Sequence, residues 1–320
     1  MNIEEPFTGL DADIHYSGKW NTRGWTFQEM AMSTRVLAFG DAGIHFLGID
    51  KLHTLGHQPI PGPHNSSIYL LRGAGELCYM HWFGAVATPY SKRSLTYPHD
   101  RFPALSGIAR YFSEELKDEY VAGLWKRELH RSLFWACSEN SIQTLGVLID
   151  ELSDLSKYVA PSWSWACRQD SVGYTHLRFS GYSPIFEGYR EEYRSMETDI
   201  TYKGADRFGQ IKEASLQIRL DKHAEPGGEL TMLLLGSAKS GILASTLNTG
   251  FLGDLGDPED LEDLEDLEDL EDDRWIYGLI IHPAPGTDKF YRVGTFYSPP
   301  SYRWGTRLFK DCPEKSVVLI

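Results

Sequence analysis

The stretch Ala160-Pro161-Ser162-Trp163-Ser164-Trp165-Ala166 decides how this chain of 320 residues is expected to pack. Bulky residues alternate with small ones, as on a strand with one buried face: Trp163, Trp165 and Cys167 against Ser162, Ser164 and Ala166. Pro161 fits the first residue of a strand or a sheet edge, because it donates no backbone hydrogen bond. The stretch therefore predicts a core strand, with Trp163 and Trp165 as buried structural residues.

Strand-like sequence continues toward the C-terminus. Apolar and polar residues alternate over residues 215–220, and apolar runs follow at residues 230–235, 275–281, 290–296 and 317–320. The chain contains 9 Trp, 17 Tyr and 15 Phe, a content that favours sheets packed around large rings. We therefore expect an α+β fold whose aromatic-rich C-terminal part is mostly antiparallel β.

Two helices are expected before the tryptophan-rich stretch. In the first, Asp100 is the expected N-cap, Pro103 suits the first turn, and one face is apolar: Leu105, Ile108, Ala109 and Phe112. The second is expected over residues 119–137, where apolar residues share one face: Ala122, Trp125, Leu129, Leu133 and Ala136. Trp125 is thus a third expected structural residue, and the two helices are expected to pair.

A second distinctive phrase lies near the N-terminus: Arg23-Gly24-Trp25-Thr26-Phe27-Gln28-Glu29. A short helix is expected over residues 26–32 and a strand over residues 35–39. The phrase groups charged and amide side chains beside an indole, an assembly suited to a ribose, an amide or a phosphate. In that interpretation Glu29 is the candidate catalytic acid or base, and the binding residues are Arg23, Trp25 and Gln28. The alternative is an ion pair between Arg23 and Glu29 that locks a turn, a common arrangement in ordinary domains.

Four residues have a spacing that weakly suggests zinc ligands: His53, His57, Cys78 and His81. Gly56 and Pro59 disfavour the helix that would put the first two on one face, and close cysteine pairs are missing. Dispersed loop histidines and no metal are therefore expected. The sequence also lacks a phosphate-binding glycine loop, a Gly-x-Ser-x-Gly elbow and a His-Glu-x-x-His motif, so we expect no cofactor.

The formal charge of −14 comes almost entirely from one acidic low-complexity repeat. Residues 254–273 carry 13 carboxylates and no basic residue, and without them the formal charge is −1. The repeated Leu-Glu-Asp unit places a leucine every third residue, which gives no lasting stripe on a helix of about 3.6 residues per turn. We expect a disordered loop, with a transient helix on a basic partner as the alternative. The remainder has no basic surplus, so nucleic acid is not an expected partner.

The cysteines and the chain start suggest a compartment. The four cysteines show no close pairing, as is typical of reduced intracellular proteins: Cys78, Cys137, Cys167 and Cys312. The first residues lack the basic start and apolar run of a secretory signal. No apolar stretch approaches the roughly 20 residues of a membrane helix. We expect a cytoplasmic location and no membrane contact.

The N-terminal phrase, continued by Ser33-Thr34-Arg35-Val36-Leu37-Ala38-Phe39, resembles the closing block of the fungal heterokaryon-incompatibility (HET) domain. That block is usually written R-G-W-T-x-Q-E and then L-S-x-R-x-L-x-F. Residues 100–107, 120–125, 129–135 and 160–166 resemble the region that follows the domain in many family members. Two departures stand out. Phe46-Leu47-Gly48 replaces the family's W-E-C phrase, and the earlier Y-x-x-L-S-Y-x-W-G and W-I-D-x-x-C-I-N-Q blocks have no counterpart.

The resemblance implies a role in non-self recognition between fungal strains, where incompatible pairings trigger programmed cell death. It divides the chain into the C-terminal edge of an α/β, TIR-like HET domain (1–50), a loop-rich connector (51–94), the helical pair (95–140) and a β-rich region (158–320) with the acidic insert. The chain is then expected to be a non-catalytic recognition or scaffold region with an unidentified protein partner. Because some TIR domains cleave NAD, an NAD-cleaving enzyme completed by Arg23, Gln28 and Glu29 is one alternative. A gene fragment without an independent role is another.

Overall fold

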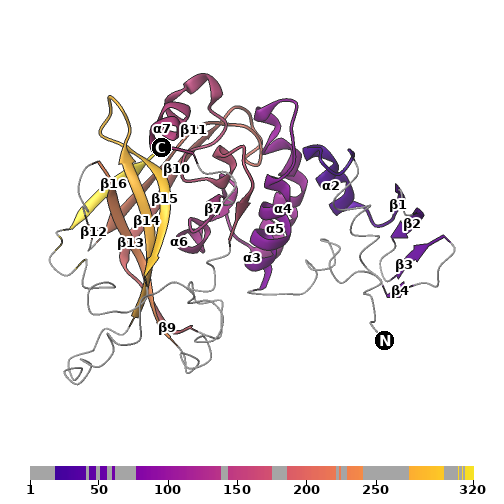
Figure 1. Ribbon diagram of the computed structural model, residues 1–320, viewed down its shortest axis with the longest axis horizontal. Helices are drawn as coiled ribbons and strands as arrows, with labels where there is room; N and C mark the ends of the chain where they lie inside the picture. Colours follow the sequence, from indigo (N-terminus) through magenta and orange to yellow (C-terminus); the bar gives the residue numbers. More distant parts are fainter. Residues whose placement is uncertain are drawn as a thin grey trace.

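The computed structural model shows an α+β protein whose elements follow one another along its long axis (Figure 1). A helix and a small sheet lie at one end, helices in the middle, and a large, mostly antiparallel sheet at the other end. The predicted α+β class is therefore confirmed. The structure describes residues 19–40, 43–47, 51–55, 60–61, 77–137, 143–174, 186–220, 223–224, 229–240, 274–298, 309, 312 and 314–320.

The N-terminal end contains the predicted helix and strand. Helix α2 spans Gly24–Met32, and strand β1 spans Val36–Gly40. β1 opens an antiparallel sheet in the order β1-β2-β3-β4, with β2 at Gly43–Leu47, β3 at Lys51–Thr54 and β4 at Ile60–Pro61. The register places Leu37 opposite Phe46 and Phe39 opposite Ile44, so these four side chains share one face.

The middle layer begins with a helical segment that the sequence did not predict within the expected connector. Helix α3 (Leu77–His81), the π-helix η3 (Trp82–Ala87) and α4 (Thr88–Ser91) follow without a break. Pro89 has no N–H group and interrupts the regular helical ladder. The turn before it widens, and Thr88 N donates to Phe83 O five residues back. The buried residues keep the spacing of one helical face: Trp82, Phe83, Val86, Ala87 and Tyr90.

Helix α5 (Ser106–Leu116) follows two 3-10 turns, η4 (Pro98–Asp100) and η5 (Pro103–Leu105). Its predicted apolar face is buried, as expected. The predicted N-cap at Asp100 is wrong, because the two turns separate it from α5 and Leu105 takes the cap position. Asp100 Oδ2 instead accepts a hydrogen bond from Trp25 Nε1 at 3.2 Å.

The helix predicted over residues 119–137 is wrong, and so is the helical pair. The segment forms a hairpin of β5 (Tyr120–Val121) and β6 (Leu124–Trp125), the short helix α6 (Leu129–Ser132) and strand β7 (Ala136–Cys137). The cause is a tight turn at Ala122 and Gly123, whose φ values of 52° and 89° are incompatible with a right-handed helix. Trp125, Leu129 and Leu133 are nevertheless buried, by neighbours on all sides.

The strand predicted over residues 160–166 is also wrong, although the predicted burial of Trp163 and Trp165 is confirmed. The chain turns after Pro161 and then forms the 3-10 helix η8 (Trp165–Cys167). Ser164 caps η8 by accepting a hydrogen bond from Ala166 N at 3.1 Å. The serines of the stretch are buried as well as the tryptophans, so the alternation in size does not separate a core face from a solvent face.

The predicted β-rich C-terminal region is confirmed. Within the described residues, eight strands of this region form one sheet in the order β10-β11-β16-β15-β14-β13-β12, with β9 paired to β13. All neighbours are antiparallel except β15 and β16. The strands are β9 (Phe186–Glu191), β10 (Tyr193–Tyr202), β11 (Ile211–Leu220), β12 (His223–Ala224), β13 (Thr231–Ser240), β14 (Arg274–Pro283), β15 (Phe290–Ser298) and β16 (Lys315–Leu319). The acidic insert expected at residues 254–273 lies outside the described residues.

Smaller elements connect the helical layer to this sheet. Helix α7 (Leu145–Ser153) leads into the 3-10 helix η7 (Leu155–Lys157), and strand β8 (Val172–Gly173) pairs with β7. Ile149 of α7 packs with Tyr291 of β15 in a small apolar cluster. Helix α7 is thereby fixed beside the edge of β15.

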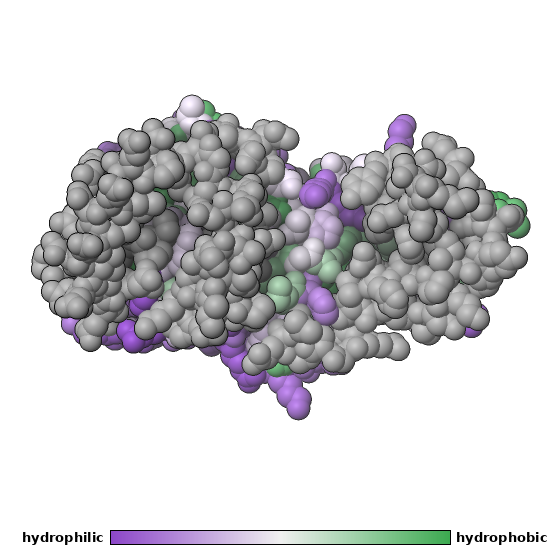
Figure 2. All heavy atoms as spheres, turned by 60° about the horizontal axis from the view of Figure 1, so that its bottom comes forward, coloured by the Kyte–Doolittle hydropathy of each residue, from purple (hydrophilic) through white to green (hydrophobic). Residues whose placement is uncertain are grey.

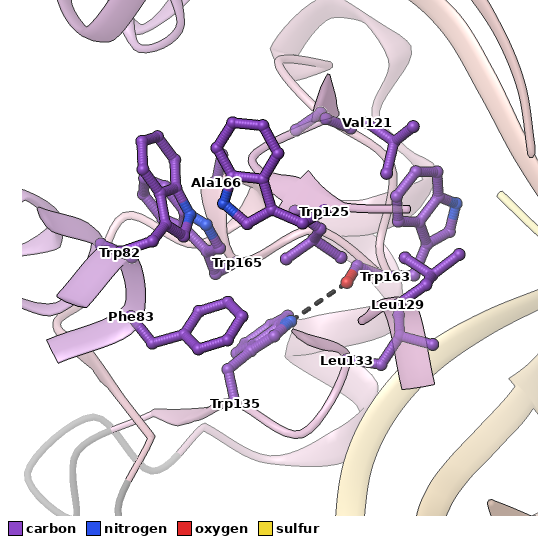
Figure 3. Close-up of a cluster of buried hydrophobic side chains, with 14 of the residues drawn as sticks. Trp82, Phe83, Val121, Trp125, Leu129, Leu133, Trp135, Trp163, Trp165 and Ala166 are labelled. Carbon is purple, nitrogen blue, oxygen red and sulfur yellow. Dashed lines mark hydrogen bonds between the residues drawn. The ribbon is translucent and has the colours of Figure 1, made fainter. Parts of the chain in front are cut away.

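One continuous cluster of buried side chains joins the three regions of the molecule. It extends from Phe27 on α2, through the tryptophans, to Leu319 on β16. Figure 3 shows its centre, where Trp135 Nε1 donates a hydrogen bond to Trp163 O at 3.0 Å. Trp125 packs edge-on against Trp82, with ring centroids 5.2 Å apart. The segments predicted from the sequence thus share a core.

Candidate functional site

Helix α2 carries the residues that the sequence proposes for binding or catalysis. Gln28 is half-buried, and its Oε1 accepts a hydrogen bond from Gly107 N at 2.7 Å. Gly107 lies in the first turn of α5, where backbone N–H groups have no partner within the helix. Gln28 therefore caps α5 from a neighbouring helix, and its amide oxygen is committed to that contact.

The neighbours of Gln28 are also used to fasten α2. Trp25 is partly exposed and donates to Asp100, which lies just before α5. Arg93 Nη1 donates to Arg23 O at 3.2 Å and to Thr26 Oγ1 at 3.1 Å. Burial lowers the pKa of Arg93 to about 10, so its guanidinium remains charged at neutral pH. Together these contacts make the N-terminal phrase a joint between α2 and the helical layer.

The structure does not bring Arg23 and Glu29 together. Both side chains are exposed, and neither forms an ion pair with the other, although both lie in the part of the chain that the structure describes. Glu29 thus lacks the burial on which its catalytic interpretation depends. Of the four proposed residues, Trp25, Gln28 and Glu29 lie on α2, whereas Arg23 is the extended residue just before it.

The weak zinc candidates are not assembled either. Within the described ranges, no three His, Cys, Asp or Glu side chains come together as metal ligands. His53 lies on β3, Cys78 and His81 lie on α3, and His57 is outside the described residues. Burial lowers the pKa of His81, so its ring is neutral at neutral pH.

The buried tryptophans converge on the turn between β5 and β6. Trp82 and Trp165 each donate from Nε1 to Gly123 O at 2.9 Å. Ser164 Oγ donates to the neighbouring Ala122 O at 2.6 Å. The turn backbone therefore satisfies three buried donors, two of them from the tryptophan-rich stretch. These interactions build a rigid frame around the turn.

A cavity of about 270 Å³ lies beside this frame, where no sequence motif predicted a site. It is bounded by β7, α7, η8 and β15. Its polar lining consists of Cys137, Gln143, Cys167, Arg168, Arg292 and Thr295. Arg168 lies two residues after the tryptophan-rich stretch, and Arg292 interrupts the apolar run at residues 290–296. These two arginines, each beside or within an apolar stretch, were the sequence signals that could have indicated the cavity.

Arg292 and Cys167 set the electrostatics of the cavity. The Arg292 guanidinium lies 3.5 Å from the centroid of the Trp135 ring, and its Nη2 donates to Trp135 O. Burial lowers the pKa of Arg292 to about 10, so this group is charged at neutral pH. Burial raises the pKa of the Cys167 thiol to about 11, so the thiol is neutral and does not balance that charge.

An apolar face is exposed at the N-terminal end of the molecule. Leu37 and Phe39 are 57% and 73% exposed on the shared face of β1 and β2. Leu55, whose N–H donates to Ile44 O at 2.9 Å, is 76% exposed beside them. Figure 2 shows hydrophobic side chains at the surface at the right-hand end, which carries β1–β4 in Figure 1. We call Leu37, Phe39 and Leu55 the apolar face.

Comparison of the chain with protein-family models, with curated proteins and with solved structures gives no match in any of the three. None of the helices in the described ranges combines the length and apolar character needed to cross a bilayer. The function is therefore inferred from the geometry of the apolar face, the α2 joint and the cavity.

Proposed function

We propose that this chain is a HET-family protein that acts in fungal non-self recognition and the programmed cell death associated with it. Its own part is to bind another protein as a recognition or scaffold module rather than to catalyse a reaction. The observation that carries this proposal is the apolar face on the strands that follow the HET-like phrase.

The apolar face supports a binding role because its pattern is that of a buried surface. The L-x-F part of the HET-like phrase corresponds to Leu37 and Phe39, which alternate with half-buried residues along β1. Alternation of this kind normally points the larger apolar side chains into a core. Large apolar residues gathered at a surface are typical of protein interfaces, where a partner removes them from water.

The α2 joint supports a role without catalysis. The amide oxygen of Gln28 and the indole N–H of Trp25 are committed to Gly107 and Asp100, and Glu29 is open to solvent. A general acid or base acts best when it is held near the reacting group and shielded from water. None of the three side chains meets both conditions.

A double substitution on the apolar face tests the proposal. The chain and its Leu37→Ser/Phe39→Ser variant would be overexpressed in a filamentous fungus, and dead cells counted with a vital dye. We expect the wild type to cause death and the variant to lose that effect without losing its fold. Leu155→Ser is the matched control, because Leu155 is 82% exposed on η7, away from the apolar face. Equal cell death from the double variant and the control would contradict the binding role.

Glu29→Gln separates binding from catalysis. We expect this variant to cause as much cell death as the wild type, because an exposed carboxylate outside a pocket contributes no catalytic step. Purified wild-type protein should release no nicotinamide from NAD. Sustained release that Glu29→Gln abolishes would replace the binding proposal with an NAD-cleaving enzyme.

The proposal includes a cytoplasmic location. Cys137 and Cys167 are free thiols, as in most proteins of reducing compartments. Fluorescence microscopy of the tagged chain would test the location. A signal confined to a membrane-bound compartment would contradict it.

A further inference from the structure

Two arginines line the cavity with more hydrogen-bond donors than the protein satisfies. Arg292 is 4% exposed, and its Nε is buried without a hydrogen-bond partner. Arg168 is 8% exposed, and its Nε is likewise without a partner. A guanidinium carries five N–H donors, so each side chain retains capacity for an acceptor.

The acceptors that the two arginines do have are few and mostly neutral. Arg292 Nη2 donates to the Trp135 carbonyl, and Arg168 Nη2 donates to Gln143 Oε1 at 3.0 Å. Among the described residues the one ion pair of either side chain joins Arg168 Nη2 to Asp170 Oδ2 at 3.7 Å. Arg292 has no ion pair there. Two cations therefore line the cavity, and Asp170, the carboxylate that pairs with Arg168, is partly exposed and is not among the lining residues.

Contacts within the protein explain only part of why two arginines line this cavity. The stacking of Arg292 on Trp135 and its bond to the Trp135 carbonyl explain how β15 is held against β7. They do not explain why a second arginine lines the same space, where the terminal Nη atoms of both side chains, unlike the enclosed Nε atoms, can meet a ligand. Buried charges are normally paired, because an unpaired one carries a large desolvation cost. An anionic ligand would supply both the acceptors and the missing charge.

We propose that this cavity binds a small organic anion whose carboxylate or phosphate group accepts hydrogen bonds from Arg168 and Arg292. Its apolar part lies against Leu148 and Leu152 of α7, which also line the cavity. The volume of about 270 Å³ is just below the range of about 300–1,000 Å³ for drug-sized ligands, so the ligand is small. This inference is independent of the apolar face and of the proposed role in cell death.

Isothermal titration at fixed ionic strength tests the site. The probes are phenyl phosphate and benzoate, which share a ring and differ in the anionic group, with phenol as the neutral probe. We expect saturable binding of at least one anionic probe, and none of phenol over the same range. The stronger of the two anions identifies the group that the arginines prefer.

Two variants of α7 control for charge and folding. Leu148→Glu places a carboxylate at the half-buried wall of the cavity, whereas Val147→Glu places it on the neighbouring exposed position outside the lining. A carboxylate that occupies the site should weaken anion binding about tenfold or more, while Val147→Glu should leave it unchanged. Arg168→Gln should weaken binding of the anionic probes and leave the melting temperature of the protein unchanged. Equal binding of phenol and phenyl phosphate, no binding of either anion, or unaltered binding by Leu148→Glu would each overturn the proposal.

Discussion

Substitution of Gly123 by alanine tests whether the turn between β5 and β6 organises the core. Gly123 has a φ of 89°, and its carbonyl accepts hydrogen bonds from two indoles. A Cβ added here would lie 2.9 Å from Trp165 Nε1 and 3.2 Å from Trp165 Cε2. The alanine methyl group would therefore strain the backbone and push an indole away from its acceptor.

The expected cost combines two effects. An alanine held at positive φ costs about 1–2 kcal/mol relative to glycine. Displacement of the buried Trp165 ring costs a further ~2–3 kcal/mol, because it overpacks the core and leaves the indole N–H without its acceptor. We expect Gly123→Ala to lower the free energy of unfolding by roughly 3–5 kcal/mol, a large part of the ~5–15 kcal/mol typical of a folded domain.

Two other glycines separate the effects. Gly286 also has a positive φ, 73°, but nothing lies within 4 Å of an added Cβ, so Gly286→Ala reports backbone strain alone. Gly146, in helix α7, has neither a positive φ nor a close neighbour, and Gly146→Ala should stabilise the protein by about 0.5–1 kcal/mol. Urea unfolding followed by tryptophan fluorescence measures all three. A loss from Gly123→Ala no larger than that from Gly286→Ala would refute the packing argument.

Three further predictions concern buried side chains. Trp163→Ala should lose about 3–5 kcal/mol in urea unfolding, whereas Trp25→Ala, at a partly exposed position, should lose less than about 1 kcal/mol; equal losses would contradict the core placement. Burial lowers the pKa of His130 to about 3, below its unfolded value near 6.5, so the unfolded state alone takes up a proton as the pH falls through 6.5. The free energy of unfolding should then decrease by about 2 kcal/mol from pH 6.5 to pH 5 because of this residue, and His130→Phe should remove that decrease. The same pH dependence in wild type and variant would exclude His130 as its source. Burial raises the pKa of Cys167 from 9.0 to about 11, so iodoacetamide at pH 8 should alkylate it about a hundredfold more slowly in the folded than in the urea-unfolded protein, as mass spectrometry would show; equal rates would contradict the burial of the thiol.

The C-terminal strands could be predicted from the sequence because the sheet has unequal faces. Along β11, Leu216, Ile218 and Leu220 are buried, while Gln217 and Arg219 between them are not. An alternating pattern then reports strand geometry directly. The buried side of helix α5 could be predicted for the same reason, since the opposite side of that helix meets solvent.

Residues 120–125 and 160–166 could not be predicted in the same way, because every one of them is buried. Period arguments need a solvent face, and without one a run of apolar residues fits a helix, a strand or a turn equally well. Gly123, a glycine inside the expected helix, is the local signal against a helix there.

The role of Gln28 was hidden for a different reason. The sequence marked this residue as a candidate binding residue, and the structure shows its amide oxygen capping α5. Its partner, Gly107 N, is 79 residues away, and no local pattern identifies such a partner. The cavity was hidden likewise, because Arg168 and Arg292 come together only when β15 packs beside η8.

The stretches that carry the resemblance to HET proteins are largely those that build the frame. Ser162 Oγ accepts from Arg292 N at 2.9 Å and Ser162 N donates to Ile320 O at 3.0 Å, so the tryptophan-rich stretch also ties the last strands to the core. Substitutions in these stretches should therefore lower stability and any cell-death activity together. Substitutions of Leu37 or Phe39 should lower activity alone, because exposed side chains contribute little to folding.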